Sequence, residues 1–413
     1  MNNIIVLVAM LALFSQPVFF SLLGALGIQY EGLETSPVYV IYIVSLFLLS
    51  FVIYIYIILI RGFLSQEVII LSVLFIMFLL HLLWALFDSI NTEILPKSLI
   101  LFILFGLPGF FTAVIIIKTK SISKFIRFTE VLLLLVGATI IKATLMPTLL
   151  GTKTTALGGA SYQSLSYYSA FISGMLLFYI IKVNENDRVR CSARLWYKFI
   201  LYSIVVGCMF TTLLGGGRGA FLLLILYLLI AIYYKISLSC KELKYVNIIK
   251  NYVFMVLIIC ASLLLINLSL EIEFIQTGFK RATQYFTSEG IDIKKGSSGR
   301  DVVYQEALRY IGQSPIIGYG PFSYLEKTIQ GHNIILDILL QYGFVGIVFI
   351  LALIFSLFIR IFKNWSSTNH WVLVSFLYPM LMLIFSGVYL HTTLFVFGLS
   401  YFTLYKKNIL GPN

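Results

Sequence analysis

Charged residues are scarce in this sequence. Asp, Glu, Lys and Arg make up 11% of its 413 residues, whereas hydrophobic residues make up 60%, and the mean hydropathy is +0.99. Soluble proteins carry about 25% charged residues. The composition therefore excludes a soluble domain and predicts a polytopic membrane protein.

Histidine and cysteine are also scarce, with four residues of each. They form no cluster with the spacing of metal ligands, and the sequence has neither an Asp-x-Asp motif nor a Walker A loop. We therefore expect no metal, no nucleotide and no other cofactor. The cysteines fall in predicted spans or cytoplasmic loops, where no disulfide is expected; they are Cys191, Cys208, Cys240 and Cys260.

Long nonpolar runs are abundant. Twelve runs of about 20 residues can each cross the ~30 Å of hydrocarbon in a bilayer. They predict an all-α, polytopic integral membrane protein with about 12 transmembrane helices, in a single domain over residues 1–413. Because no Lys or Arg precedes the first run, we interpret it as a retained span and not as a cleaved signal peptide. The runs lie near residues 4–24, 37–60, 67–87, 98–117, 126–146, 164–182, 197–214, 218–234, 251–270, 333–359, 371–388 and 392–405.

The distribution of basic residues predicts the orientation. The net charge is +12, but the basic residues are spread over short loops and form no tract that would bind nucleic acid. If both termini face the cytoplasm, 18 of the 29 basic residues lie inside and four lie in the short outer segments. The remaining seven lie in one long loop, residues 271–331. This bias predicts that the long loop faces outward.

The long loop and the helix after it hold most of the polar residues. Arg300 opens a predicted amphipathic helix that Gly312 would end, and a Gly318-Tyr319-Gly320 turn follows. His332-Asn333 then begins the tenth nonpolar run, and after nine further residues come Gly343 and Gly346. The nonpolar face predicted for the loop helix consists of Val303, Ala307, Leu308 and Ile311.

A second arginine, Arg218, follows three glycines at the outer end of the eighth run. A helix N-terminus with a guanidinium suits a diphosphate, because its N–H groups and its dipole favour an anion. The pattern also fits an interfacial arginine beside glycines that allow close helix contact.

These motifs, in this order, resemble the O-antigen polymerase and O-antigen ligase superfamily over residues 211–350, about a third of the chain. The resemblance implies a metal-independent glycosyltransferase of the bacterial cytoplasmic (inner) membrane that takes glycans from undecaprenyl-diphosphate carriers on the outer side of that membrane. Its partners would be that lipid-linked oligosaccharide, the lipid bilayer and a chain-length regulator protein. Arg218 and Arg300 would hold the diphosphate. His332, with an ordinary pKa near 6.5, would be the general base.

Further residues are candidates for substrate binding. Asn333, Asp337 and Gln341 form one stripe along a helix, and Asp337 would face protein or a water-filled cavity, where it would orient the site or pair with an intramembrane cation such as Lys142. Tyr162 and Gln163 end an acid-free outer loop that suits sugars, although the tyrosine also fits an interfacial aromatic belt. Three other candidates in the long loop are Arg281, Arg309 and Tyr319.

Two acceptors remain open for such an enzyme. A polymerase transfers the glycan to a second lipid-linked repeat unit, and a ligase transfers it to lipid A-core. The Tyr162-Gln163 stretch resembles those of the polymerase branch, and this resemblance favours the polymerase. A flippase is the non-enzymatic alternative, but transporters usually place ionisable residues near the membrane midplane, whereas here they gather at one outer face.

The charge bias yields a first test. In a variant without native cysteines, Gly290→Cys should react with a membrane-impermeant thiol reagent added outside the cell, and Arg190→Cys should not, because residues 183–196 are predicted to face the cytoplasm. Accessibility labelling of intact and permeabilised cells measures this. Outside labelling of position 190 but not of position 290 would reverse the predicted topology.

Overall fold

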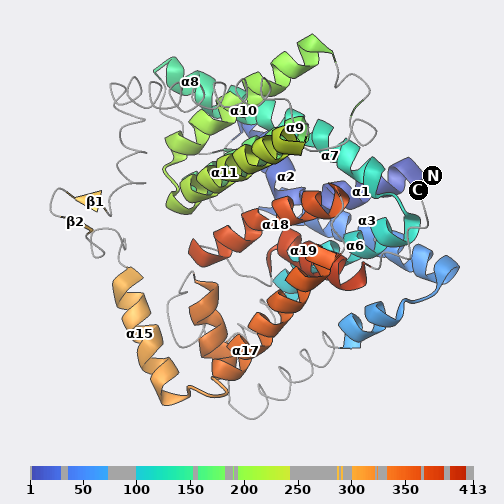
Figure 1. Ribbon diagram of the computed structural model, residues 1–413, viewed down its shortest axis with the longest axis vertical. Coiled ribbons are helices and arrows are strands. Elements are labelled where there is room, and N and C mark those ends of the chain that lie inside the picture. The colour runs from blue at the N-terminus through green and yellow to red at the C-terminus, as the bar shows by residue number, and fades with distance from the viewer. Residues whose placement is uncertain are drawn as a thin grey trace. The chain divides into compact units, whose positions relative to one another are not determined.

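The computed structural model describes most of the predicted helices. The described residues are helical except for turns, short connections and the antiparallel strands β1 (Phe286–Thr287) and β2 (Gly290–Ile291) (Figure 1). The prediction of an all-α membrane protein is thus confirmed in its class. The structure describes residues 2–28, 36–72, 99–151, 157–181, 189, 194–241, 286–287, 290–291, 300–320, 323, 333–363, 367–385 and 391–405.

Within these ranges, seven helices are long and apolar enough to cross a membrane, or up to eight if one broken pair counts as a span. The chain is therefore a multi-pass membrane protein. The count of twelve spans stays a prediction, since most of the runs at 67–87 and 251–270 lies outside the described residues. The seven are Pro37–Arg61 (α3), Leu99–Thr119, Ile122–Leu149, Tyr162–Ile181 (α9), Leu195–Gly215 (α10), Arg218–Ile236 and Ile334–Ser356.

The first predicted span differs from the structure. Residues 4–24 were expected to form one helix, but α1 (Asn2–Leu13) and α2 (Ser15–Ala25) are separated at Phe14. Pro17 lies in the first turn of α2, where its missing N–H costs no internal helix hydrogen bond. Its ring is incompatible with an uninterrupted helix through this point.

The chain forms two compact units, one of residues 1–15, 40–125 and 292–413, the other of residues 16–39 and 126–291. In the first unit, α6 (Leu107–Thr119) packs on α1 and on α19 (Thr393–Leu404), which also contacts α18 (Ser367–Phe385). A Cβ on Gly109 would lie 2.2 Å from the Thr393 carbonyl oxygen. Glycine is therefore required where α6 crosses α19, as is common where membrane helices approach closely.

In the second unit, α9 is the central helix. It is buried over most of its length and packs against α10 and α11 (Arg218–Lys241). Gly174 lies under the ring of Tyr227, where a Cβ would come within 2.1 Å of ring atoms. This unit also contains most of α7 (Ile122–Ile140), the π-helical turn η3 (Ile141–Leu145), which carries Lys142, and α8 (Met146–Leu149).

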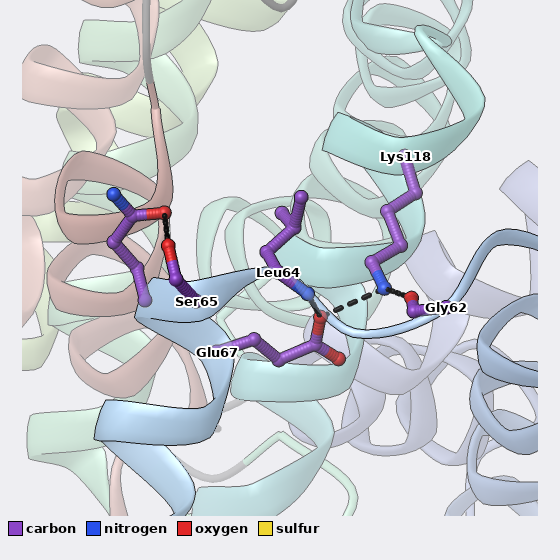
Figure 2. A network of polar contacts seen from close by, with 6 residues as sticks. Gly62, Leu64, Ser65, Glu67 and Lys118 are labelled. Atoms are coloured by element: carbon purple, nitrogen blue, oxygen red, sulfur yellow. Dashed lines mark hydrogen bonds and ion pairs between the residues drawn. The ribbon is translucent and has the colours of Figure 1, made fainter.

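A buried ion pair ties together the ends of two helices in the first unit. Nζ of Lys118, at the end of α6, lies 2.8 Å from Oε2 of Glu67, and the two side chains are 3% and 0% exposed. Lys118 also donates to the Gly62 carbonyl (Figure 2), and Arg61, at the end of α3, donates to the Lys118 carbonyl. Both segments were predicted to face the cytoplasm, and their contact agrees with their lying on one side.

Glu67 has a second role in this cluster. Its Oε2 accepts a hydrogen bond of 3.0 Å from the backbone N–H of Leu64, the residue before the helix of residues 65–72. A glutamate in the third helical position that binds back to the capping residue is half of a capping box. One carboxylate therefore begins a helix and neutralises a buried lysine (Figure 2).

This ion pair should dominate local stability. Glu67→Gln leaves Lys118 charged and buried without its counter-ion, so we expect a loss of ~3–5 kcal/mol and a lower thermal unfolding midpoint in detergent. The double variant Glu67→Leu/Lys118→Met should recover much of that loss. Glu306→Gln is the matched control, because its ion pair with Arg309 is longer, at 3.8 Å, and exposed. It should cost less than ~1 kcal/mol, and equal midpoint shifts for Glu67→Gln and Glu306→Gln would refute this assignment.

Candidate functional site

The helix predicted to open at Arg300 is present as α15 (Arg300–Gln313). Ala307 and Ile311 are buried and pack with Leu340 of α17 (Ile334–Lys363). Two details of the prediction were wrong. Leu308 is 56% exposed, because it lies one residue, about 100°, around the helix from Ala307, and Gly312 lies inside the helix, which ends at Gln313. Leu99, Tyr310, Leu336 and Leu339 complete the cluster.

The span predicted at 333–359 is not one continuous helix. Gly343 has φ 58° and ψ −154°, which breaks α17 into residues 334–342 and 344–363. Only glycine adopts this backbone conformation readily. The first motif glycine is therefore the point at which the helix changes direction.

A turn from the end of α15 is inserted at this break. The N–H groups of Tyr319 and Gly320 donate to the carbonyls of Leu340 and Gln341, both at 2.8 Å. In return, the N–H groups after the break, on Phe344 and Val345, donate to the carbonyls of Pro315 and Ile316 at 2.8 and 3.2 Å. These bonds satisfy backbone groups that the broken helix cannot pair itself, as a nonpolar environment requires. We call this arrangement of residues 315–320 and 340–345 the interlock.

Close packing explains the glycines of the interlock. A Cβ on Gly318 would lie 2.6 Å from the Leu340 carbonyl oxygen, and one on Gly343 would lie 2.3 Å from that of Ile316. Gly346 directly follows the interlock, and a Cβ there would lie 2.4 Å from the Cβ of Tyr342. Gly318 also has a positive φ of 68°. The motif glycines Gly318 and Gly343 therefore lie where the backbones of the turn and of α17 are in close contact.

Because of the interlock, the two helices run in the same direction. The C-terminal end of α15 meets the break in α17, and the Ala307–Ile311 face packs on Leu340 and its neighbours. α15 and the first half of α17 thus lie side by side (Figure 1), with Arg300 and Asn333 at the same end. The N-termini of both helices, with the cationic Arg300, therefore lie at this end.

Asn333 caps α17. Its Oδ1 accepts hydrogen bonds from the N–H groups of Ile335 (2.9 Å) and Leu336 (3.4 Å), the standard role of an N-cap amide. The predicted base, His332, directly precedes this cap and lies outside the described residues, as does Arg281.

Asp337 faces the protein interior, as its position in a span predicted. It is 1% exposed, and neither carboxylate oxygen has a hydrogen-bond partner among the residues that the structure describes. Gln341, the next member of the stripe, is also buried and donates from Nε2 to the Asp337 carbonyl at 3.0 Å. Pairing of Asp337 with Lys142 stays a prediction.

Arg218 is the first residue of α11, and the second unit holds it beside α9. Gly216 (φ 63°) ends α10, and the N–H of Gly217 donates to Ser166 Oγ at 3.2 Å. Ser166 in turn donates to the carbonyl of Tyr162 at 3.1 Å. Sequence reasoning missed Ser166, whose hydroxyl joins the glycine turn to the start of α9.

Tyr162 and Gln163 lie at that start, so three predicted site residues come together in the second unit. They open α9 instead of ending a loop, because Ser161 Oγ accepts from the N–H of Ser164 at 3.2 Å and caps the helix. Gln163 Nε2 donates to the Tyr162 hydroxyl at 3.3 Å, and Tyr162 is 39% exposed. A phenol and an amide are thus presented next to the Arg218 turn.

The other two candidates have structural contacts of their own. Arg309 is exposed, pairs with Glu306 and lies 4.9 Å from the centre of the Tyr310 ring. The Tyr319 hydroxyl donates to the Tyr310 carbonyl at 3.0 Å and lies 3.2 Å from Gln313 Oε1. These contacts give both side chains a structural role in and around α15.

Comparison with known families places both arginines in one matched sequence segment. A family model described as O-antigen ligase matches residues 203–351. This match supports the resemblance of the chain to the O-antigen ligase and polymerase superfamily. The matched segment contains Arg218, α15, the interlock and both motif glycines, and the superfamily consists of glycosyltransferase-like enzymes. Comparison with curated proteins and with solved structures yields no match. Among the described residues, no group of three His, Cys, Asp or Glu side chains could hold a metal ion.

Proposed function

We propose that the protein is an O-antigen polymerase, or a polymerase of a related surface polysaccharide. It joins undecaprenyl-diphosphate-linked repeat units at the outer face of the cytoplasmic membrane, with both termini in the cytoplasm. One observation carries the proposal: Arg300 lies at the same end of a two-helix assembly as Asn333, the cap that His332 precedes. This supports a cation and a base that act on one substrate.

The reaction needs a proton acceptor and stabilisation of a leaving anion. His332 takes the proton from a hydroxyl of the acceptor sugar, and the oxygen attacks the anomeric carbon of the donor. The bond from that carbon to the diphosphate oxygen breaks, and the diphosphate leaves with the electron pair. Arg300 and Arg218 hold the charge that develops on it. No cofactor is required, since a diphosphate is already a good leaving group.

The helix dipoles support an anion at the Arg300 end. α15 and the first half of α17 both present their positive ends there, and each is worth ~0.3–1 kcal/mol to a nearby negative charge. Asn333 Oδ1 already pairs with two of the N–H groups of α17, so the guanidinium provides the stronger donor to a phosphate. Asn333 and Asp337 then act on the side of the acceptor and the base.

The acceptor distinguishes two versions of the enzyme. Tyr162 and Gln163 beside the Arg218 turn favour a second lipid-linked glycan, the polymerase reaction. The description of the matching family favours a ligase, which uses lipid A-core. In a deletion strain, surface glycan of single repeats would indicate a polymerase. Loss of all surface glycan, with lipid-linked polymer accumulating, would indicate a ligase.

Arg218 and Arg300 should be required for the planar, two-pronged hydrogen bonding of the guanidinium group and not only for its positive charge. Arg218→Ala and Arg300→Ala should abolish polymer formation in cells that still insert the protein, and Arg→Lys should restore little, because lysine cannot grip two phosphate oxygens. Arg309→Ala is the matched control on α15, since Arg309 pairs with Glu306. The glycan ladder of complemented deletion strains measures this. If Arg309→Ala abolished polymer formation while Arg300→Ala left it normal, the assignment of the diphosphate site to Arg300 would be wrong.

Substitution of His332 should lower the rate of glycan transfer without preventing donor binding. His332→Ala should still bind undecaprenyl diphosphate through the arginines, yet transfer should fall ~10²–10⁴-fold, as is typical for loss of one acid–base group. Asn333→Ala should be milder, because it removes a helix cap worth ~1 kcal/mol and not the proton acceptor. Transfer by purified protein, with a binding measurement on the same variants, tests this. Near-normal turnover of His332→Ala would exclude the base role.

A further inference from the structure

We propose that the interlock is a positioning element for the transfer reaction. It sets how far Arg300 on α15 stands from Asn333 at the start of α17, the residue that follows His332 in the sequence. This inference rests on the proposed function, because it assigns the distance between a diphosphate-binding arginine and a base. The positioning residues are Gly318 and Gly343, neither of which would touch the substrate.

The argument begins with what a membrane helix needs. A continuous α17 would satisfy its own backbone hydrogen bonds. The break at Gly343 releases carbonyls and N–H groups, and the turn of residues 315–320 pairs with four of them. The span itself does not require this exchange. What the exchange provides is a fixed connection between α15 and α17.

The connection is rigid for local reasons. Tyr319 donates its backbone N–H to α17 and its hydroxyl to the Tyr310 carbonyl of α15, so one residue holds both helices. Ser314 closes the turn from within, because its Oγ donates to the Gly318 carbonyl at 2.8 Å. The contacts of Gly318 and Gly343 leave no room for a Cβ. The turn can therefore pack against α17 in only one position.

Because each helix has a fixed geometry, the position of the turn also determines where Arg300 lies relative to Asn333. With a rise of ~1.5 Å per residue, Arg300 lies ~20 Å along α15 from the turn, and Asn333 lies ~15 Å along α17 from the break. A slip of one residue at the interlock would move Arg300 by ~1.5 Å and about 100° around the helix relative to Asn333. A misplacement of ~1 Å can cost ~10²-fold in rate. The interlock thus controls transfer more than donor binding.

Distances between spin labels test the positioning directly. Val302→Cys and Ile335→Cys are suitable sites, because both side chains are exposed and lie near the two N-termini. In protein without native cysteines, pulsed electron resonance should give a narrow distance distribution. Gly343→Ala and Gly318→Ala should broaden or shift it, and Ser314→Ala should do so mildly if the glycine variants fail to fold. Gly312→Ala is the matched control, since nothing lies within 4 Å of a Cβ there.

Activity is measured on the same variants without labels. Transfer of lipid-linked repeat units from a deletion strain should fall by up to ~10²-fold in Gly343→Ala, whereas binding of undecaprenyl diphosphate should change little. Gly312→Ala should match the wild type in both. An unchanged distance distribution in both glycine variants would overturn the interlock as a positioning element. A changed distribution with undiminished transfer would show that the spacing does not matter. Equal losses of binding and transfer would make the turn part of the binding site. If the wild type itself transferred no glycan, the proposed function would fail while the distance comparison still stood.

Discussion

Backbone hydrogen bonding in a nonpolar environment is the constraint on which this structure depends. Each N–H and C=O in a span needs a partner, because water does not supply one there. A continuous helix pairs these groups internally, whereas the unpaired groups at a break must bond to another part of the chain. α17 breaks at Gly343, and the turn after α15 provides the hydrogen-bond partners for the backbone groups at the break. The parallel arrangement of α15 and α17, and the placing of Arg300 and Asn333 at one end, follow from that exchange.

Charge obeys a related rule in the first unit. Lys118 and Glu67 are almost fully buried, and the two helix ends that they join depend on the pair remaining intact. Asp337 is the contrasting case, since its buried carboxylate has no partner in the described part of the chain. A buried ionisable group within a span usually serves a function. Asp337, one turn beyond the Asn333 cap, is thus a natural contributor to the site that we propose.

Much of the candidate site could be predicted from local patterns. The helix at Arg300, the glycine turn before Arg218 and the burial of Asp337 follow from capping, turn chemistry and the cost of charge in a span. Two of the errors share one cause. The end of α15 and the break in α17 depend on which neighbour each segment meets, and hydrophobic periodicity does not contain that information. The Ser166 hydroxyl was missed for the same reason, since its partner Gly217 is distant in sequence.

The sequence by itself determined that this protein is a multi-pass helical membrane protein and that residues 203–351 resemble the O-antigen ligase and polymerase superfamily. It did so because nonpolar run length and motif spacing are local properties. Only the tertiary structure decided why Gly318 and Gly343 are glycines, and that Arg300 and Asn333 lie at one end. The partners of a broken helix lie more than twenty residues away along the chain, and only folding brings such groups together.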